Sequence, residues 1–141
     1  MIEQTSIFGP MLGMMLLTIA VWLYMFAKRI PYIQTKQAEG QEPTAEMLAA
    51  APSSITSPSD NLKNLFEVPI LFYAAVLFLY VTQQVDALYL YAAWGFFLFR
   101  ALHSILHCTI NIIMARFVLY LIASLCLFFM IIRAAIAHFV G

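Results

Sequence analysis

Residues 7–27 read IFGPMLGMMLLTIAVWLYMFA, a run without a charged side chain that is long enough to cross a bilayer as a helix. Three further apolar stretches follow, at about residues 65–82, 87–108 and 117–139. Each is close to the roughly 20 residues that a transmembrane helix needs. The sequence therefore predicts an all-α integral membrane protein, a four-helix bundle that forms a single domain over residues 1–141.

The composition supports this class and excludes others. Hydrophobic residues make up 64% of the chain and charged residues only 10%, whereas soluble domains carry about 25% charged residues. This balance excludes a nucleic-acid-binding protein, a disordered tail and an ordinary soluble enzyme. Glu3, and no basic residue, precedes the first span, so we expect a retained helix rather than a cleavable signal peptide.

A polar segment separates the first two spans. Residues 28–61 are rich in Gln, Glu, Thr, Ser and Pro and are predicted to form a loop, with one short helical turn at residues 45–51. Ser57, Pro58 and Asp60 resemble an N-cap, a first helical proline and a capping-box acid. They predict that the second helix begins near Pro58.

Basic residues gather on one side of the predicted bundle. The side that holds the first loop and the turn before the fourth span carries Lys28, Arg29, Lys36, Lys63 and Arg116. Because cytoplasmic loops carry an excess of Lys and Arg, this side is predicted to be cytoplasmic. Both termini are then on the non-cytoplasmic side.

The third span carries an unusual set of polar side chains: Arg100, His103, Ser104, His107 and Asn111. At the helical rotation of about 100° per residue, all five fall within an arc of about 100°. Ionisable groups inside a span are costly and usually face a bundle interior or a cavity. This face is therefore predicted to point into the protein.

The second helix supplies a matching set: Lys63, Asn64 and Glu67. Counting residues from the turn between the second and third helices places Glu67 within one helical turn of Arg100 and places Asn64 beside Ser104. A carboxylate and a guanidinium at the same depth predict an ion pair, because each charge compensates the cost of burying the other in a low-dielectric interior.

Three interpretations of this cluster remain open. It can be a structural network that holds helices together through hydrogen bonds. It can bind an anionic ligand that enters from the cytoplasmic half. This interpretation is based on the number of hydrogen-bond donors in the cluster, which is larger than one carboxylate can satisfy. The spacing of His103 and His107, with Glu67 as a third ligand, also allows a metal or haem site. Arg100 on the same face would repel a metal ion, so no metal site is predicted.

Two segments resemble motifs of the MAPEG family (membrane-associated proteins in eicosanoid and glutathione metabolism). Residues 64–71, NLFEVPIL, resemble its second-helix motif, and residues 100–111, RALHSILHCTIN, resemble the third-helix motif of its bacterial branch. The resemblance implies a homotrimer of four-helix subunits in a bacterial inner membrane, with glutathione bound as a co-substrate between neighbouring subunits. The expected partners are membrane lipids and a lipophilic small-molecule substrate, and no nucleic acid.

The resemblance also implies roles for individual residues. Asn64 and Glu67 would hold the polar ends of glutathione, and Arg100 and His103 would contact its charged groups. Arg116 would stabilise the glutathione thiolate, since a nearby cation lowers a thiol pKa. The implied activity is that of a glutathione-dependent transferase or peroxidase acting on lipophilic electrophiles. Further candidate binding residues on the same face are Ser104, His107, Asn111 and Lys63.

The chain departs from the enzymes of this family at one place. Those members carry several arginines just before the second-helix asparagine, whereas residues 56–63 contain Lys63 as the only cation. The alternative function is therefore a non-catalytic membrane protein that binds a lipid or a partner protein through the same interface.

Overall fold

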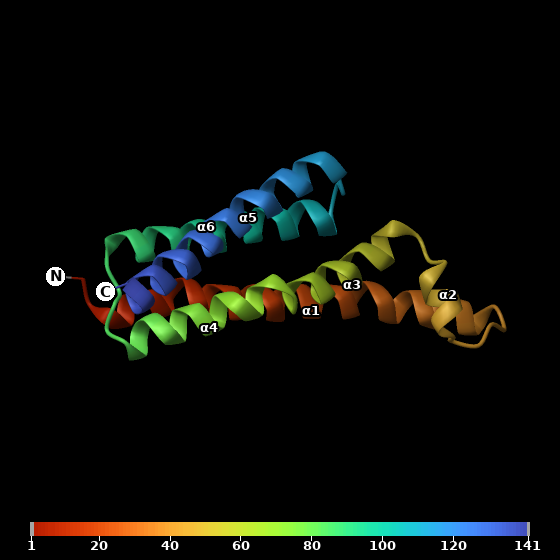
Figure 1. The fold of residues 1–141 in the computed structure, drawn as a ribbon. Coiled ribbons are helices and arrows are strands. Elements are labelled where there is room, and N and C mark those ends of the chain that lie inside the picture. Colours follow the sequence, from red (N-terminus) through yellow and green to blue (C-terminus); the bar gives the residue numbers. More distant parts are fainter. Residues whose placement is uncertain (1, 141) are drawn as a thin grey trace.

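The computed structural model describes residues 2–140, and these residues form helices joined by short connections (Figure 1). In chain order the elements are the 3-10 helix η1 (Gln4–Ile7) and the helices α1 (Phe8–Ala38), α2 (Ala45–Ala49), α3 (Ser53–Leu65), α4 (Val68–Val81), α5 (Ala87–Cys108) and α6 (Ile113–Val140). The predicted all-α fold is confirmed.

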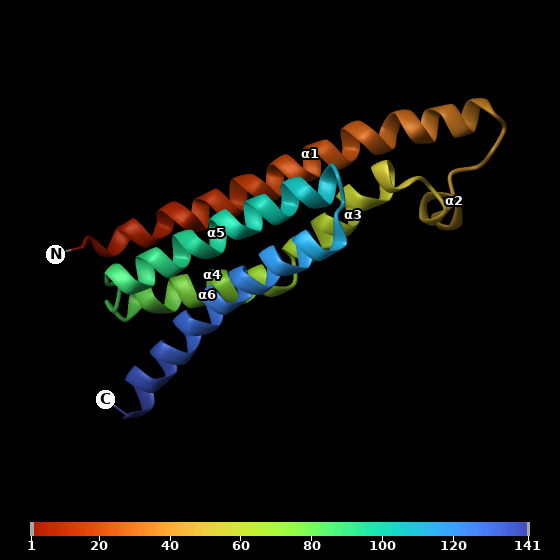
Figure 2. The same ribbon diagram turned by 90° about the horizontal axis from the view of Figure 1, so that it is seen from above.

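The long helices lie roughly alongside one another, and both termini lie at the same end of the bundle (Figures 1 and 2). We call this the termini end, and the end that carries α2 the loop end. Helix α5 packs against α6 and α1, and α3 packs along α1. Figure 2 also shows α6 diverging from the other helices toward its C-terminus.

Within residues 2–140, three helical stretches are long and apolar enough to cross a membrane: Gln4–Ala38, Ser53–Val81 and Ile113–Val140, with mean hydropathies of 1.9, 1.8 and 2.4. The length and hydropathy of these helices confirm the prediction of a membrane protein. Helix α5 coincides with the third predicted span but is not among the three, because polar residues interrupt its apolar sequence. Four membrane crossings and the trimer remain predictions.

The first helix is longer than the predicted span. The sequence places a loop at residues 28–61, but α1 continues past Lys28 to Ala38 with Pro31 inside it. Hydropathy marks where the apolar run ends, and a helix can continue beyond that point because its backbone bonds are internal. The short helical turn predicted at residues 45–51 is present as α2, whose N-cap Thr44 accepts a hydrogen bond from the amide of Met47 at 3.1 Å.

The predicted start of the second helix near Pro58 is wrong. Helix α3 begins at Ser53, directly after Pro52, and both Ser57 and Pro58 are buried inside it. Ser57 therefore caps no helix. Pro52 is an alternative helix-start signal that lies earlier in the chain. Pro58 lies in the second turn of α3, where it removes one helical hydrogen bond.

The second span is two helices with a break between them. Helix α3 ends at Leu65 and α4 begins at Val68, with Glu67 in a non-helical conformation at ψ −103°. Pro69 lies in the first turn of α4, where a missing amide donor costs least. The break releases backbone groups from the helical ladder at the depth of the polar cluster.

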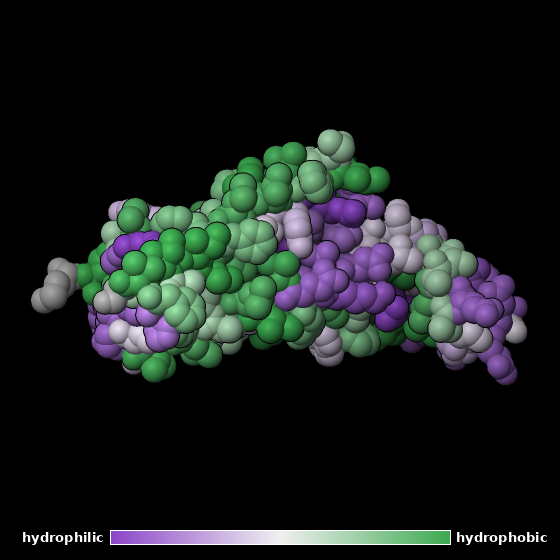
Figure 3. Space-filling model, viewed as in Figure 1, coloured by the Kyte–Doolittle hydropathy of each residue, from purple (hydrophilic) through white to green (hydrophobic). Residues whose placement is uncertain are grey.

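The apolar core lies between α1, α4, α5 and α6. Phe72 of α4 stacks on Phe96 of α5 with ring centroids 4.4 Å apart, and both are fully buried. Gly13 of α1 lies so close to α5 that a Cβ there would be 2.9 Å from the ring of Phe97. Apolar side chains also cover much of the surface, and hydrophilic ones gather toward the loop end (Figure 3). This pattern is that of a lipid-facing bundle.

Candidate functional site

Four polar side chains of α5 lie on one buried face. Arg100 is fully buried, and Ser104, His103 and His107 are at most 6% exposed. The polar face inferred from helical periodicity is therefore directed into the protein. Asn111 differs: α5 ends at Cys108, and Asn111 lies in the turn beyond it with a positive φ of 53°. Helical extrapolation fails at this residue because the helix has already ended.

Arg100 is held by Asn64 at the end of α3. Its Nη1 donates to the side-chain oxygen Oδ1 of Asn64 at 3.1 Å, and its Nη2 donates to the Asn64 backbone carbonyl at 3.2 Å. The helix break after Leu65 exposes this carbonyl for bonding. A fully buried guanidinium is thus held by one neutral residue through a forked pair of bonds.

The predicted ion pair between Glu67 and Arg100 is wrong for the single chain. Glu67 is exposed, and none of the ion pairs within residues 2–140 includes it. Depth counting places the two residues at one level but does not fix where Glu67 points around the helix. The break at residues 66–67 turns that side chain to the outside of the bundle.

Asn61 is a polar residue that sequence reasoning missed. It is fully buried, accepts a hydrogen bond from the Ser104 hydroxyl at 3.3 Å and donates to the Cys108 sulfur at 3.5 Å. Residue counting along the sequence predicts Asn64 beside Ser104, so the observed partner, Asn61, is three residues earlier along α3. The available signal was the spacing, since Asn61 precedes Asn64 by one helical turn on the same face.

Arg116 lies in the first turn of α6 and is oriented by two neighbours. Its Nη1 donates to the side-chain oxygen of Asn111 at 2.6 Å, and Asn111 in turn donates to the Ser57 hydroxyl at 3.3 Å. The Arg116 carbonyl oxygen lies 2.9 Å from Nδ1 of His103. A carbonyl only accepts, so a neutral His103 ring carries its proton on Nδ1 and leaves Nε2 as an acceptor.

A cavity of about 220 Å³ lies where these elements meet, lined by Asn64, His103, Ile113, Arg116, Phe117 and Tyr120. Tyr120 was not identified from the sequence. It follows Arg116 by four residues, so the two share one face of α6, and its ring lies 5.4 Å from the Arg100 guanidinium carbon. A cation–π contact of this kind stabilises the buried charge without neutralising it.

Three buried polar atoms of the α5 face lack partners among the described residues: Nε of Arg100, Nε2 of His103 and Nδ1 of His107. Of these three residues, His103 lines the cavity. A buried polar atom without a hydrogen bond costs about 1–3 kcal/mol. The cluster therefore contains buried donors and acceptors that the single chain does not use.

Lys63 and Glu67, two of the predicted binding residues, lie away from this cavity in the single chain. The Lys63 side chain is 75% exposed and pairs with Asp60 at 3.4 Å. Within residues 2–140 no three His, Cys, Asp or Glu side chains form a metal-binding group. The rings of His103 and His107 meet edge to face at 5.5 Å, and Glu67 does not join them.

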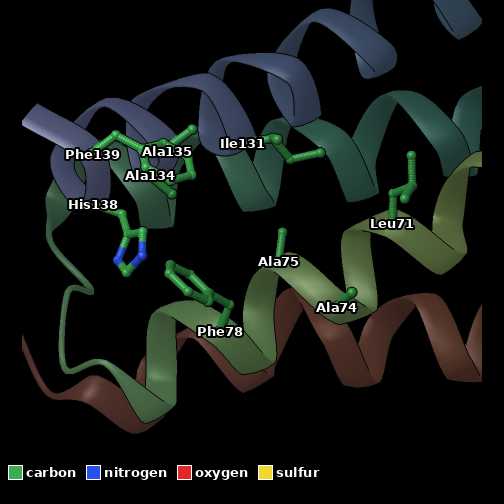
Figure 4. A pocket seen from close by; sticks show the side chains of 9 residues that line it. All are labelled: Leu71, Ala74, Ala75, Phe78, Ile131, Ala134, Ala135, His138 and Phe139. Atoms are coloured by element: carbon green, nitrogen blue, oxygen red, sulfur yellow. The ribbon is translucent and has the colours of Figure 1, made fainter.

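A second cavity, of about 390 Å³, lies between α4 and α6 nearer the termini end. Figure 4 shows apolar side chains of both helices around it, with His138 and Phe78 facing each other at one end. It opens where α6 diverges from the bundle. Its other end, at Leu71, lies in the first turn of α4, the helix that follows the break after Leu65.

Comparison with known families decides how these features are to be interpreted. The sequence model of the MAPEG family matches residues 7–136, which is nearly the whole chain. The chain belongs to the MAPEG family. Comparisons with curated proteins and with solved structures each gave no match. Membership of the MAPEG family makes this a membrane protein related to eicosanoid and glutathione metabolism, as the sequence motifs imply.

Proposed function

We propose that this MAPEG protein is a glutathione-dependent transferase or peroxidase that acts on lipophilic electrophiles in the membrane. The observation that carries the proposal is the cavity beside Arg116, which contains a cation together with the unpartnered Nε2 of His103. Glutathione has carboxylates, amides and a thiol, and these groups match the donors and acceptors left free there.

Arg116 is the residue that we assign to the chemistry. Its guanidinium lines the cavity and is held by Asn111 through one nitrogen, so its other donors are free to face a thiolate. A neighbouring cation lowers the pKa of a thiol, and the thiolate is the reactive nucleophile. The thiolate attacks an electrophilic carbon, forms the S–C bond and displaces the leaving group with its electron pair.

The peroxidase reaction uses the same thiolate. Attack on the O–O bond of a lipid hydroperoxide gives the lipid alcohol and a glutathione sulfenic acid. A second glutathione then condenses with the sulfenic acid to form the disulfide and water, which balances the two-electron reduction. Both reactions need only glutathione and the substrate, so the same cavity serves for either.

The size of the cavity favours a site completed by a neighbouring subunit. Ligand pockets are usually about 300–1,000 Å³, whereas this one has about 220 Å³ in the single chain. Exposed Glu67 lies just after Asn64, on the surface of a span where a carboxylate needs a partner. In a homotrimer, Glu67 would face the next subunit and could contact the amino end of a glutathione molecule bound between the two.

The apolar cavity between α4 and α6 is the place that we assign to the hydrocarbon part of the substrate. Its lining is almost entirely apolar, and it lies between α4 and α6, two helices with many exposed apolar side chains. Ala75→Phe should fill it. We expect the KM for a long-chain lipid hydroperoxide to rise about tenfold, while turnover of a small chlorinated dinitrobenzene stays unchanged. Equal effects on both substrates would contradict this assignment.

The direct test is turnover by the purified protein in detergent or nanodiscs. Chlorinated dinitrobenzene and a lipid hydroperoxide should each be consumed only when glutathione is present. The rival is a non-catalytic protein that binds a lipid or a partner, which is favoured by the single cation, Lys63, in the stretch before Asn64 and by its position outside the cavity. That function predicts thermal stabilisation by lipid and no turnover of either electrophile.

A further inference from the structure

A separate pocket of about 410 Å³ lies at the loop end, between α1, α2 and α3. Its polar wall combines Arg29 of α1 with one face of α3, formed by Thr56, Ser59, Asp60 and Lys63 at helical spacing. Its other wall consists of apolar residues of α2. This pocket shares no residue with the cavity beside Arg116, and the proposed activity does not use it.

The charges in this pocket do not cancel. Lys63 pairs with Asp60 at 3.4 Å, which leaves Arg29 as the unbalanced charge. The Nε atom of Arg29 is buried and has no hydrogen-bond partner among the described residues. A buried N–H donor on a cation is best satisfied by an anionic oxygen, and the guanidinium geometry suits phosphate.

The position of the pocket indicates where such an anion comes from. Arg29 follows directly after the uncharged run of residues 7–27, so it lies where α1 leaves the apolar part of the bundle. Figure 3 shows that hydrophilic residues dominate the surface toward this end. Phosphates of lipid headgroups lie at this depth, just outside the hydrocarbon core.

We propose that this pocket binds the phosphodiester group of a membrane phospholipid. The single negative charge of a phosphodiester matches the net positive charge of the pocket. Arg29 Nε donates to a phosphate oxygen, and the hydroxyls of Thr56 and Ser59 supply further donors. The apolar wall from α2 packs against the glycerol and the first methylene groups, which inorganic phosphate lacks.

The test uses the full chain, delipidated in a neutral detergent, and three probes: dihexanoylphosphatidylglycerol, dihexanoylglycerol and inorganic phosphate. The phospholipid should raise the melting temperature by about 5 °C at saturation, and the other two probes should raise it by much less. An equal rise with dihexanoylglycerol would show binding of the chains alone. An equal rise with inorganic phosphate would show a free-anion site. Either result overturns the proposal.

Single substitutions test whether Arg29 is responsible for the rise in melting temperature with the phospholipid. Arg29→Gln should abolish the phospholipid shift, and Arg29→Lys should retain only part of it, because an ammonium keeps the charge without the Nε donor. The matched control is Lys28→Gln: Lys28 is the neighbouring cation, lies over the Tyr24 ring at 5.5 Å and does not line the pocket. Native mass spectrometry should find one fewer retained phospholipid in Arg29→Gln than in Lys28→Gln. Equal phospholipid retention, or equal shifts, in the two variants would refute the assignment.

Discussion

At the termini end, Asp86 and Arg133 meet through two hydrogen bonds of 2.8 and 2.5 Å, whereas Arg100 in the polar cluster has no carboxylate partner. The guanidinium of Arg133 also lies 4.2 Å from the centroid of the Tyr89 ring. Arg100 is fully buried, while the Arg133 and Asp86 side chains are 34% and 44% exposed. Arg100, whose charge is shielded from solvent, is therefore the arginine that lacks a carboxylate partner among the described residues.

Two neutral side chains show the same contrast, although the buried Oε1 of Gln84 at the termini end is also unpartnered among the described residues. At the termini end, the Gln4 side chain donates to the Val85 carbonyl at 3.0 Å and accepts from the Val85 amide at 2.9 Å, so both ends of its amide are used. In the polar cluster, His103 uses one ring nitrogen and leaves the other buried and unpartnered. The Asp86–Arg133 and Gln4–Val85 pairs are satisfied within the chain, whereas Nε2 of His103 is not, and the proposed function assigns that atom to a ligand.

The largest effect that we expect in this comparison concerns Asn64. Asn64→Leu removes the side-chain acceptor of a buried cation and should destabilise the protein by about 3 kcal/mol, because hydrogen bonds to charged groups are the costly ones to lose. Glu42→Gln is the control and should change stability by less than about 0.5 kcal/mol, since Glu42 is exposed in the connection between α1 and α2. Thermal unfolding in detergent measures both. An unfolding temperature of Asn64→Leu equal to that of the control would show that Asn64 does not stabilise the buried Arg100.

The second effect concerns Arg116 and is on activity rather than stability. Arg116→Ala should lower glutathione turnover about 100-fold, as expected when a donor to a developing charge is removed. The ultraviolet absorbance of bound thiolate should disappear while thermal unfolding stays nearly unchanged. Arg116→Lys should restore part of the signal, because it keeps the charge and loses the forked geometry. If both variants match the parent, Arg116 is a lipid-headgroup anchor.

The third effect is a pH dependence at the termini end. The hydrogen bond from Arg133 lowers the pKa of Asp86 to about 2, below its value of about 4 in an unfolded chain. The stabilisation is therefore complete above pH 4 and is lost as the pH falls from about 4 to about 2. Solvent screening limits it to about 1 kcal/mol or less. In Asp86→Asn, unfolding measured across this range should lack this component; an unchanged pH profile would contradict it.

The fourth effect, similar in size to the third, concerns Gln4. Gln4→Leu removes two hydrogen bonds to the Val85 backbone and should cost about 1 kcal/mol, because these bonds lie at the bundle end, where water can replace them. Activity toward both electrophiles should stay at the parental level. A loss of turnover in this variant would show that the termini end is coupled to the polar cluster, against the separation drawn above.

Sequence reasoning succeeded where a local rule determines the outcome. Helix α5 follows its N-cap Asp86, which accepts from the Tyr89 amide at 3.0 Å, and four polar residues share its buried face because helical periodicity is rigid. The same reasoning failed at Asn111, because α5 ends at Cys108 and helical periodicity does not fix the direction of side chains beyond that residue. It also failed at Glu67, because no local rule predicts how the break after α3 rotates the next residue.

The sequence by itself determined that this chain is an all-α membrane protein of the MAPEG family and that a polar face of α5 points inward, because hydropathy, motif order and helical periodicity are properties of the chain alone. Only the tertiary structure decided which groups meet. Asn64 rather than Glu67 holds Arg100, Asn61 reaches Ser104, and Tyr120 closes the cavity. These contacts depend on the rotation of each helix about its own axis, which packing against the other helices sets.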